Sequence, residues 1–301
     1  MDRDVSGMSD ERISSKKSTG VAILRPEDFP QVPEIVRTSV SHKTISRANW
    51  RNRIFKDFNA LDTTFEDCDF RYSVFERAYF RDSKFVNCRF DGARFVDCNF
   101  KNANFYKCDL KFVVFQRCLL EVREVLPSLP FEPNIRREAL QNLRANALST
   151  GDYASQGLLV LQEVEATKRH YSYALRGFDS YYQKKYSGIG SKLSAAVRLG
   201  WLHLGGLIWG HGEKPGRLLL SAIALLSALT FINFWSVMPR VGWVESANGL
   251  YVLEYVIRLF LSMSVTPKFQ GFVTVDYLIV VIRYIYIGLF ISVLYRAISH
   301  R

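Results

Sequence analysis

The chain has 301 residues, 48% of them hydrophobic, and a formal net charge of +11 at neutral pH. This length allows two or three folding units rather than one large core, and the positive charge suits either nucleic acid or anionic lipid headgroups as a partner. The histidines are scattered, and the sequence has no nucleophile elbow, phosphate loop or metal-ligand spacing, so we expect no enzymatic activity and no cofactor.

The first sixty residues fall into two segments. Residues 1–20 are polar and lack an apolar core, so we expect a disordered N-terminus without a signal peptide. Residues 21–60 are mixed in composition and are interrupted by prolines. We expect them to form an N-terminal capping segment, in which Trp50 helps to cover the first edge of the next unit.

A repeat with a period of five residues occupies residues 61–122. Every fifth position carries a large apolar side chain, and the position two before it carries a small residue or valine. The large residues are Phe65, Phe70, Phe75, Phe80, Phe85, Phe90, Phe95, Phe100, Phe105, Leu110, Phe115 and Leu120. A period of five fits neither an α-helix nor a flat strand, which indicates a β-solenoid.

The pattern resembles the pentapeptide-repeat family, a right-handed quadrilateral β-helix. The resemblance implies about three coils, in which residues twenty positions apart stack and Phe65, Phe85 and Phe105 form one internal ladder. All five cysteines lie at the small inward positions of the repeat. Because the repeat has no CxxC pair and no histidine, we interpret them as buried fillers rather than as a metal or redox site.

The charges on the outside of the repeat are balanced between basic and acidic residues. Some soluble pentapeptide-repeat proteins are acidic mimics of DNA, and that role needs a negative field that this surface lacks. We therefore expect no nucleic-acid partner here. A protein partner or trigger is the candidate ligand of the solenoid.

Residues 134–187 are predicted to form a cytoplasmic helical hairpin. The first helix covers Asn134 to Ser149, Gly151 breaks it, and Asp152 caps a second helix that runs to about Tyr186. The tyrosines and basic residues at its far end suit either stacked bases or the zone beneath a membrane, and we favour the membrane.

Residues 191–209 are predicted to form an interfacial amphipathic helix. One face carries Leu193, Val197, Trp201, Leu204 and Ile208, and the basic residues lie elsewhere. Tryptophan at amphipathic spacing is typical of a helix in the headgroup region. A packed helix of a soluble domain is the alternative.

Residues 218–298 are predicted to form an all-α membrane domain with two spans. Leu218–Val237 has no charge and matches the thickness of a bilayer, and Tyr277–Tyr295 is nearly as apolar. Leu250–Ser264 lies between them and is too short and too charged to span, which is typical of a re-entrant pore helix.

Basic residues before the first span and after the second predict that both flanks are cytoplasmic and that residues 238–272 lie outside. These residues are Lys184, Lys185, Lys192, Arg198, Lys214, Arg217, Arg296 and Arg301. We expect a multi-pass protein of a bacterial inner membrane, with the lipid bilayer as one partner and reduced cysteines in the cytoplasm.

Three further stretches carry a second resemblance. Residues 143–153, 163–165 and 209–215 are similar to landmarks of bacterial pentapeptide-repeat proteins that end in a two-span, potassium-channel-like domain. The resemblance implies a channel subunit that assembles with copies of itself as a homotetramer.

The candidate pore loop corresponds, on this resemblance, to the Thr-x-Gly-Tyr-Gly filter of potassium channels. Its residues are Ser264, Val265, Thr266, Pro267, Lys268, Phe269, Gln270 and Gly271. The threonine is retained and the Gly-Tyr-Gly core is not, so potassium selectivity is not expected. Lys268 either lines the path, where a ring of positive charges would disfavour cations, or points to external water or lipid phosphate.

Two residues of the second span are further candidates. Arg283 lies near its midpoint, where an arginine needs a partner or water, and Glu254 or Asp276 is the expected partner in a structural or a gating pair. Gly288 is a candidate inner-helix hinge, although a small residue also serves close packing.

The leading hypothesis is a homotetrameric, channel-like membrane protein whose solenoid senses a partner and gates ion passage. One alternative is a membrane-anchored interaction scaffold with a non-conducting, degenerate pore. The other is a membrane-depolarising effector in defence against phage.

Overall fold

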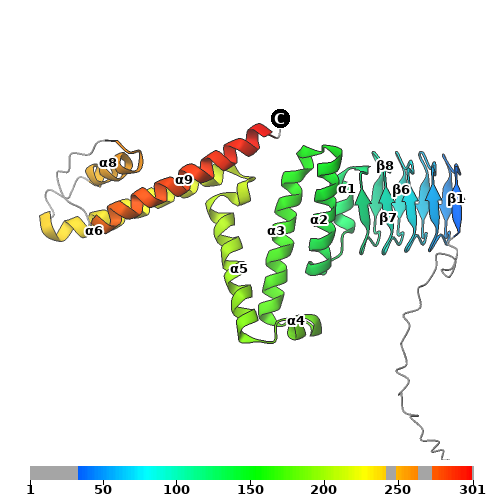
Figure 1. The fold of residues 1–301 in the computed structure, drawn as a ribbon, viewed down its shortest axis with the longest axis horizontal. Coiled ribbons are helices and arrows are strands. Elements are labelled where there is room, and N and C mark those ends of the chain that lie inside the picture. Colours follow the sequence, from blue (N-terminus) through cyan, green and yellow to red (C-terminus); the bar gives the residue numbers. More distant parts are fainter. Residues whose placement is uncertain (1–32, 242–248, 264–272, 300–301) are drawn as a thin grey trace, which may run out of the picture.

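The computed structural model describes residues 33–241, 249–263 and 273–299. A β-solenoid lies at one end, a group of helices follows it, and a long helical hairpin extends from the other side of those helices (Figure 1). The segment predicted to be disordered, residues 1–20, lies outside the described residues.

The solenoid consists of short strands that pair in parallel with the strand twenty residues further on. The strands are β1 (Glu34–Val36), β2 (Thr44–Ser46), β3 (Ile54–Lys56), β4 (Thr64–Glu66), β5 (Val74–Glu76), β6 (Lys84–Val86), β7 (Arg94–Val96), β8 (Asn99–Phe100), β9 (Asn104–Tyr106), β10 (Val114–Gln116) and β11 (Leu119–Leu120). One face is a sheet in the order β1-β3-β5-β7-β10, and another is β2-β4-β6-β9. The column makes about four turns.

The solenoid begins earlier than the sequence predicts, because residues 34–60 form coils rather than a separate cap. Ile35 lies opposite Phe55, and Ile45 lies opposite Phe65, in the same register as the later coils. The inward positions of this first coil carry isoleucine, valine or tryptophan instead of phenylalanine. These side chains fill the inward positions as phenylalanine does, but the change of residue type makes the period of five less evident in the sequence.

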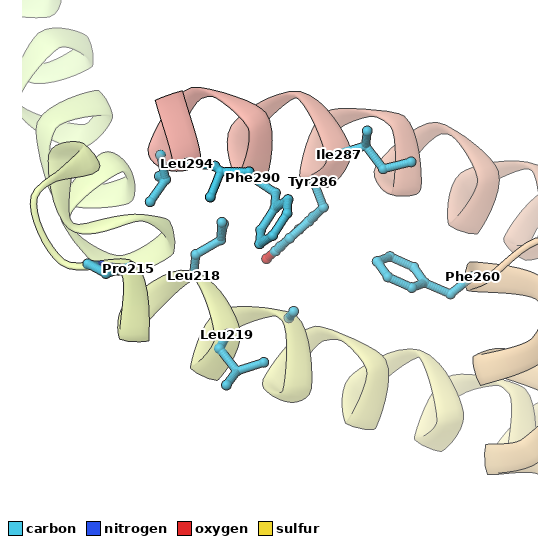
Figure 2. Close-up of a pocket in the computed structure, with 10 residues that line it drawn as sticks. Pro215, Leu218, Leu219, Phe260, Tyr286, Ile287, Phe290 and Leu294 are labelled. Atoms are coloured by element: carbon cyan, nitrogen blue, oxygen red, sulfur yellow. The ribbon is translucent and has the colours of Figure 1, made fainter. Parts of the chain in front are cut away.

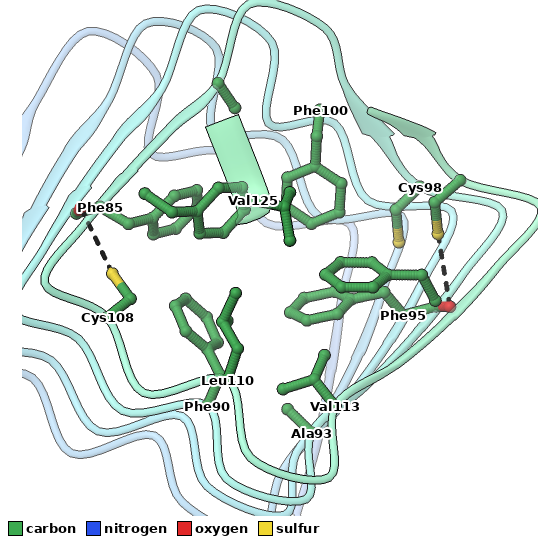
Figure 3. Packing of buried hydrophobic residues seen from close by; sticks show 14 of the residues in the cluster. Phe85, Phe90, Ala93, Phe95, Cys98, Phe100, Cys108, Leu110, Val113 and Val125 are labelled. Carbon is green, nitrogen blue, oxygen red and sulfur yellow. Dashed lines mark hydrogen bonds between the residues drawn. The ribbon is translucent and has the colours of Figure 1, made fainter. Parts of the chain in front are cut away.

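Stacked phenylalanine rings fill the interior of the column (Figure 3). The centroids of Phe65 and Phe85 are 5.0 Å apart and those of Phe85 and Phe105 are 5.1 Å apart, with nearly parallel rings. The expected internal ladder is therefore confirmed. Phe65 and Phe85 expose 1% or less of their surface, so the ladder buries large apolar areas at every coil.

The cysteines lie inside the same column. The Cys108 thiol donates to the carbonyl oxygen of Phe85 at a distance of 3.4 Å, and each other cysteine bonds a backbone carbonyl in the same way (Figure 3). Burial raises the pKa of the Cys98 thiol, which keeps it protonated at neutral pH. These contacts fit the filler interpretation.

Helix α2 (Pro133–Thr150) closes the last coil, after the short α1 (Val122–Val125) and η2 (Leu126–Ser128). Asn142 Oδ1 accepts from the Phe115 N–H at 2.8 Å, and its Nδ2 donates to the Phe115 carbonyl at 3.2 Å. Asn146 makes the same pair of bonds with Cys118, at 2.7 and 2.8 Å. Two side-chain amides thus replace the backbone of a next coil and protect the edge of the sheet.

The predicted helical hairpin pairs α2 with α3 (Tyr153–Arg176). Gly151, with φ of 72°, ends the first helix, and the Asp152 carboxylate accepts from the Ser155 N–H. The second helix ends at Arg176 instead of continuing to about residue 186, because Gly177 adopts φ of 62°. A separate short helix follows, α4 (Ser180–Lys185).

Buried His170 joins α3 to this last segment. Its Nδ1 lies 3.1 Å from the Tyr182 hydroxyl, and its Nε2 lies 3.0 Å from the Tyr186 hydroxyl. Burial, together with Arg137 and Lys185, lowers the pKa of His170 to about 4. The imidazole is therefore neutral at pH 7, with one nitrogen donating and the other accepting.

Helix α5 (Ile189–Ile208) packs against α3, and η3 (Gly210–Gly212) connects it to the hairpin of α6 (Pro215–Val241) and α9 (Val273–Ser299). The stretches 215–235 and 274–295 are long and apolar enough to cross a membrane, with mean hydropathies of 2.0 and 2.2. Only 17% and 11% of their most apolar windows are buried. The core helix of a soluble protein would be mostly buried, so these helices present apolar surface outward.

Candidate functional site

The candidate site lies in the hairpin, where α8 (Gly249–Phe260) packs against both α6 and α9 (Figure 1). Leu229 of α6, Val256 of α8 and Ile279 of α9 are buried together. One face of α8 is thus apolar and packed, and the opposite face carries the exposed Glu254. The order of a long helix, a short helix and a second long helix agrees with the segments predicted from sequence.

Polar contacts fix α8 in place. The Tyr255 hydroxyl donates to Asp276 Oδ2 at 2.7 Å and ties α8 to the first turn of α9. The other oxygen of that carboxylate is buried and has no hydrogen-bond partner among the described residues. On the outer face, Arg258 Nη2 lies 2.7 Å from Glu254 Oε1. Both acids predicted as partners of Arg283 are therefore engaged elsewhere.

Arg283 lies on α9 with its guanidinium 4.7 Å from the centroid of the Tyr284 ring, a cation–π contact. Among the described residues it pairs with neither Glu254 nor Asp276. Gly288 lies inside the continuous helix α9, and a methyl group placed there would meet no atom within 4 Å. Neither a bend nor a close approach marks Gly288 in the described part of the chain.

The candidate pore loop, Ser264–Gly271, lies outside the described residues. Its flanks are described: α8 ends at Phe260, and α9 begins at Val273. Residues 33–241, 249–263 and 273–299 contain no group of histidine, cysteine and acidic side chains that could hold a metal ion.

A tight elbow joins α5 to α6 and packs against α3. His211 and its two glycine neighbours all have positive φ, between 58° and 83°. A Cβ on Gly157 of α3 would lie 2.6 Å from a Glu213 carboxylate oxygen, and one on Gly206 of α5 would lie 3.2 Å from the His211 ring. The two glycines therefore leave room for the elbow.

Hydrogen bonds connect this elbow to both long helices. Arg217 Nη1 donates to the Gly206 carbonyl at 2.7 Å, and Ser221 Oγ donates to the Ile208 carbonyl at 2.8 Å. The Tyr286 hydroxyl of α9 lies 3.1 Å from Ser221 Oγ. A polar chain therefore crosses from α9 through α6 to the end of α5.

The elbow also gathers positive charge. Burial and the cations Lys168 and Arg217 hold the pKa of His211 below its usual value. A Cβ on Gly206 would lie 3.4 Å from the Lys168 ammonium, and Lys214 and Arg217 are both exposed. No sequence pattern indicated that Lys168, eleven residues past Gly157 on α3, would approach this place.

Two grooves open on different sides of α6. The α8-side groove, of about 480 Å³, lies between α6 and α9 and is apolar (Figure 2). It is lined by Pro215, Leu218, Leu219, Ala222, Phe260, Tyr286, Ile287, Phe290, Val293 and Leu294. The α5-side groove, of about 840 Å³, is lined by Leu204, Leu207, Ile208, Arg217, Leu220, Ser221, Ala224, Leu225, Ile282, Ile285 and Tyr286.

Comparison with known proteins identifies the repeat and nothing beyond it. Residues 46–125 match the family model described as a pentapeptide repeat region. No curated protein matches this chain.

Solved pentapeptide repeat proteins resemble part of the chain. One, from the thylakoid lumen of Arabidopsis thaliana, is 12% identical over 33% of this chain and 78% of its own, with a TM-score of 0.17. Another, Rfr23 from the cyanobacterium Cyanothece 51142, is 11% identical over 29% and 84%, with a TM-score of 0.13. QnrB1, a plasmid-mediated fluoroquinolone resistance protein, is 11% identical over 30% and 73%, with a TM-score of 0.11. The strand register of this chain itself defines its solenoid.

Proposed function

We propose that this chain is a non-enzymatic, channel-like membrane subunit. In this proposal, α6 and α9 cross the bilayer, α8 enters it partway, and four copies surround an ion path. The observation that carries it is a pair of adjacent apolar helices, mostly exposed, with a shorter helix packed against both. So much outward apolar surface is stable in lipid or against other copies, and not in water.

The placement of α5 supports the same orientation. This helix lies across the direction of α6 and α9, and α3 is on its other side (Figure 1). Ile189, Trp201 and Leu207 expose 89%, 75% and 72% of their surface. With α6 and α9 spanning, α5 rests in the headgroup layer and the solenoid extends into the cytoplasm. Both ends of the hairpin then face the cytoplasm of a bacterial cell, as the basic flanks predict.

The charged face of α8 supports assembly around water. Glu254 and Arg258 form an exposed pair on the side of α8 opposite its packed valines. At membrane depth, a charged pair facing lipid is costly, so such residues face water or other protein. A path shared by several copies provides both. Thr266, Lys268, Gln270 and Gly271 would lie near its constriction, and potassium selectivity is not part of the proposal.

Gating would start at the solenoid. A protein partner bound there would act through the amide bonds of Asn142 and Asn146 to α2, then through α3 to the elbow at Glu213 and on to α6. Each of these steps corresponds to packed or hydrogen-bonded contacts between described residues.

Current through the reconstituted chain tests the proposal. Full-length protein, verified as a tetramer, is fused into planar bilayers with symmetric salt. We expect discrete conductance steps, and Glu254→Gln should change their amplitude because it removes one charge per subunit from the path. Gln141→Ala, on the cytoplasmic α2, is the matched control and should leave the amplitude unchanged. A verified tetramer without current under any voltage or salt would reject ion passage.

A membrane-anchored scaffold is the second candidate function, because the Gly-Tyr-Gly core of the filter is missing from residues 264–271. It requires only the solenoid and an anchor. If the solenoid with α2 and α3 supports the cellular function when fused to an unrelated membrane anchor, the scaffold is favoured over the channel. The depolarising effector is a variant of the channel and would cause loss of membrane potential on activation.

A further inference from the structure

The α5-side groove combines apolar walls with positive charge at one end. Leu204 and Leu207 of α5, Ala224 of α6 and Ile285 of α9 form the walls. Arg217 lines the same groove at the start of α6. Among the side chains that the structure describes, none that lines the α8-side groove is charged, whereas Arg217 lines the α5-side groove.

The charges around this end are mainly positive. Arg217 uses Nη1 on the Gly206 carbonyl and is otherwise exposed, and Lys214 is exposed less than one turn before it. Lys168 approaches from α3. The nearby acid, Glu213, is directed toward Gly157 of α3. A negatively charged group at the mouth of the groove would therefore meet two exposed cations, Lys214 and Arg217.

The depth of the groove suits a lipid. With α6 spanning from its first residues, Arg217 lies at the cytoplasmic headgroup level, in the same plane as the exposed apolar face of α5. From Arg217 to Leu225 the helix rises about 12 Å toward the bilayer centre. This arrangement gives one end for a charged headgroup and a wall for an acyl chain.

We propose that the α5-side groove binds one anionic phospholipid of the cytoplasmic leaflet. Its phosphate pairs with Arg217 and Lys214, and one acyl chain lies against Ala224 and Ile285. The bound lipid contacts α5, α6 and α9 together, and so it stabilises the elbow between the cytoplasmic helices and the span. The inference depends on the proposed membrane placement of α6 and does not depend on conduction.

Two pairs of variants test it in the full-length chain. Arg217→Gln removes the charge at the mouth, and its control, Lys192→Gln, removes one charge at the far end of α5. Ala224→Trp fills the α5-side groove, and its control, Ala222→Trp, adds the same ring to the α8-side groove on the same helix. Amide hydrogen exchange in α6 and α9 checks that every variant keeps the folded hairpin.

The measurement is native mass spectrometry of purified protein mixed with phosphatidylglycerol or phosphatidylcholine. Both headgroups carry a phosphate, but phosphatidylcholine adds a quaternary ammonium that the cations at the mouth repel, so its net charge is zero. We therefore expect one phosphatidylglycerol per chain to be retained about tenfold more tightly than phosphatidylcholine. Arg217→Gln should weaken this preference severalfold, because Lys214 alone then faces the headgroup. Ala224→Trp should abolish the retained lipid, whereas both controls should behave as the wild type.

Equal retention of the two lipids by the wild type would overturn the inference. Equal loss in Ala222→Trp and Ala224→Trp would also overturn it, because the lipid would not be specific to this groove. A chain that is recovered from the soluble fraction instead of the membrane fraction would reject the proposed membrane placement itself, which is a separate result.

Discussion

Asn146 provides the sharpest test of how the solenoid joins the helices. Its side chain is 4% exposed, and its amide bonds both the N–H and the carbonyl of Cys118 at the open end of the last coil. Asn146→Ala leaves those two backbone groups buried without partners. Each unsatisfied group costs about 1 to 3 kcal/mol, so we expect the last coil to be destabilised by about 2 to 6 kcal/mol.

The solenoid cysteines report this loss directly. All five thiols of the chain are buried in the column, so an aromatic disulfide reagent reacts only when coils open. At about 1.4 kcal/mol per factor of ten, the Cys118 labelling rate should rise by about 30-fold to 20,000-fold when reclosing is faster than labelling. Asn134→Ala is the matched control on the same helix, because no side-chain hydrogen bond of Asn134 is present among the described residues.

Labelling of Asn146→Ala at the rate of the wild type and of Asn134→Ala would refute the reasoning. It would mean that water, or movement of α2, satisfies the Cys118 backbone. Labelling of Cys68 should change less than that of Cys118, since Cys68 lies fifty residues, about two and a half coils, before the open end.

Three further predictions address other contacts. Tyr255→Phe removes the hydroxyl that donates to Asp276 and should destabilise the packing of α8 by about 1.4 kcal/mol. Amide hydrogen exchange in α8 should then accelerate by about tenfold. Unchanged exchange would show that this hydrogen bond does not stabilise α8. Phe85→Ala removes the central ring of one ladder and should lower the free energy of unfolding of the solenoid by about 3 to 5 kcal/mol, measured by thiol labelling in urea. The control, Thr64→Ala on the outer surface, should have little effect. The folded-state pKa of His170 is about 4, below its ordinary 6.5, so the stability that comes from its neutral form is present above pH 6.5 and is lost as the pH falls toward 4. The free energy of unfolding should fall by about 2 kcal/mol between pH 7 and pH 5. Limited proteolysis after α3 should increase over this range in the wild type and not in His170→Phe.

The sequence predicted the parts of this fold that depend on regular spacing. The period of five predicted the stacking of Phe65, Phe85 and Phe105. Two long apolar runs, the second interrupted only by Arg283, predicted the two long helices. The first coil was expected to form a cap, because Ile35 and Ile45 replace phenylalanine at its inward positions and the pattern of five is weaker there. The break at Gly177 was missed because a single glycine within a polar, aromatic stretch does not by itself distinguish a helix interior from its end.

Contacts between distant residues were harder to predict. Asn142 and Asn146 are four residues apart on one face of α2, and only the open end of the last coil makes them caps. Arg283 was expected to pair with an acid because isolated charges in apolar segments need partners, but Glu254 has an arginine one turn away and Asp276 has Tyr255 opposite. Glu254 and Arg258 are four residues apart on one helix, where opposite charges meet, whereas the partner of Asp276 lies on a different helix.

The arrangement of the full-length chain in lipid tests the central claim most directly. Cryo-electron microscopy of the protein in nanodiscs should show fourfold symmetry, with α6 and α9 of each copy crossing the disc, α8 entering it partway and the solenoids on one side. A single copy in each disc, or a hairpin lying outside the lipid, would contradict the account.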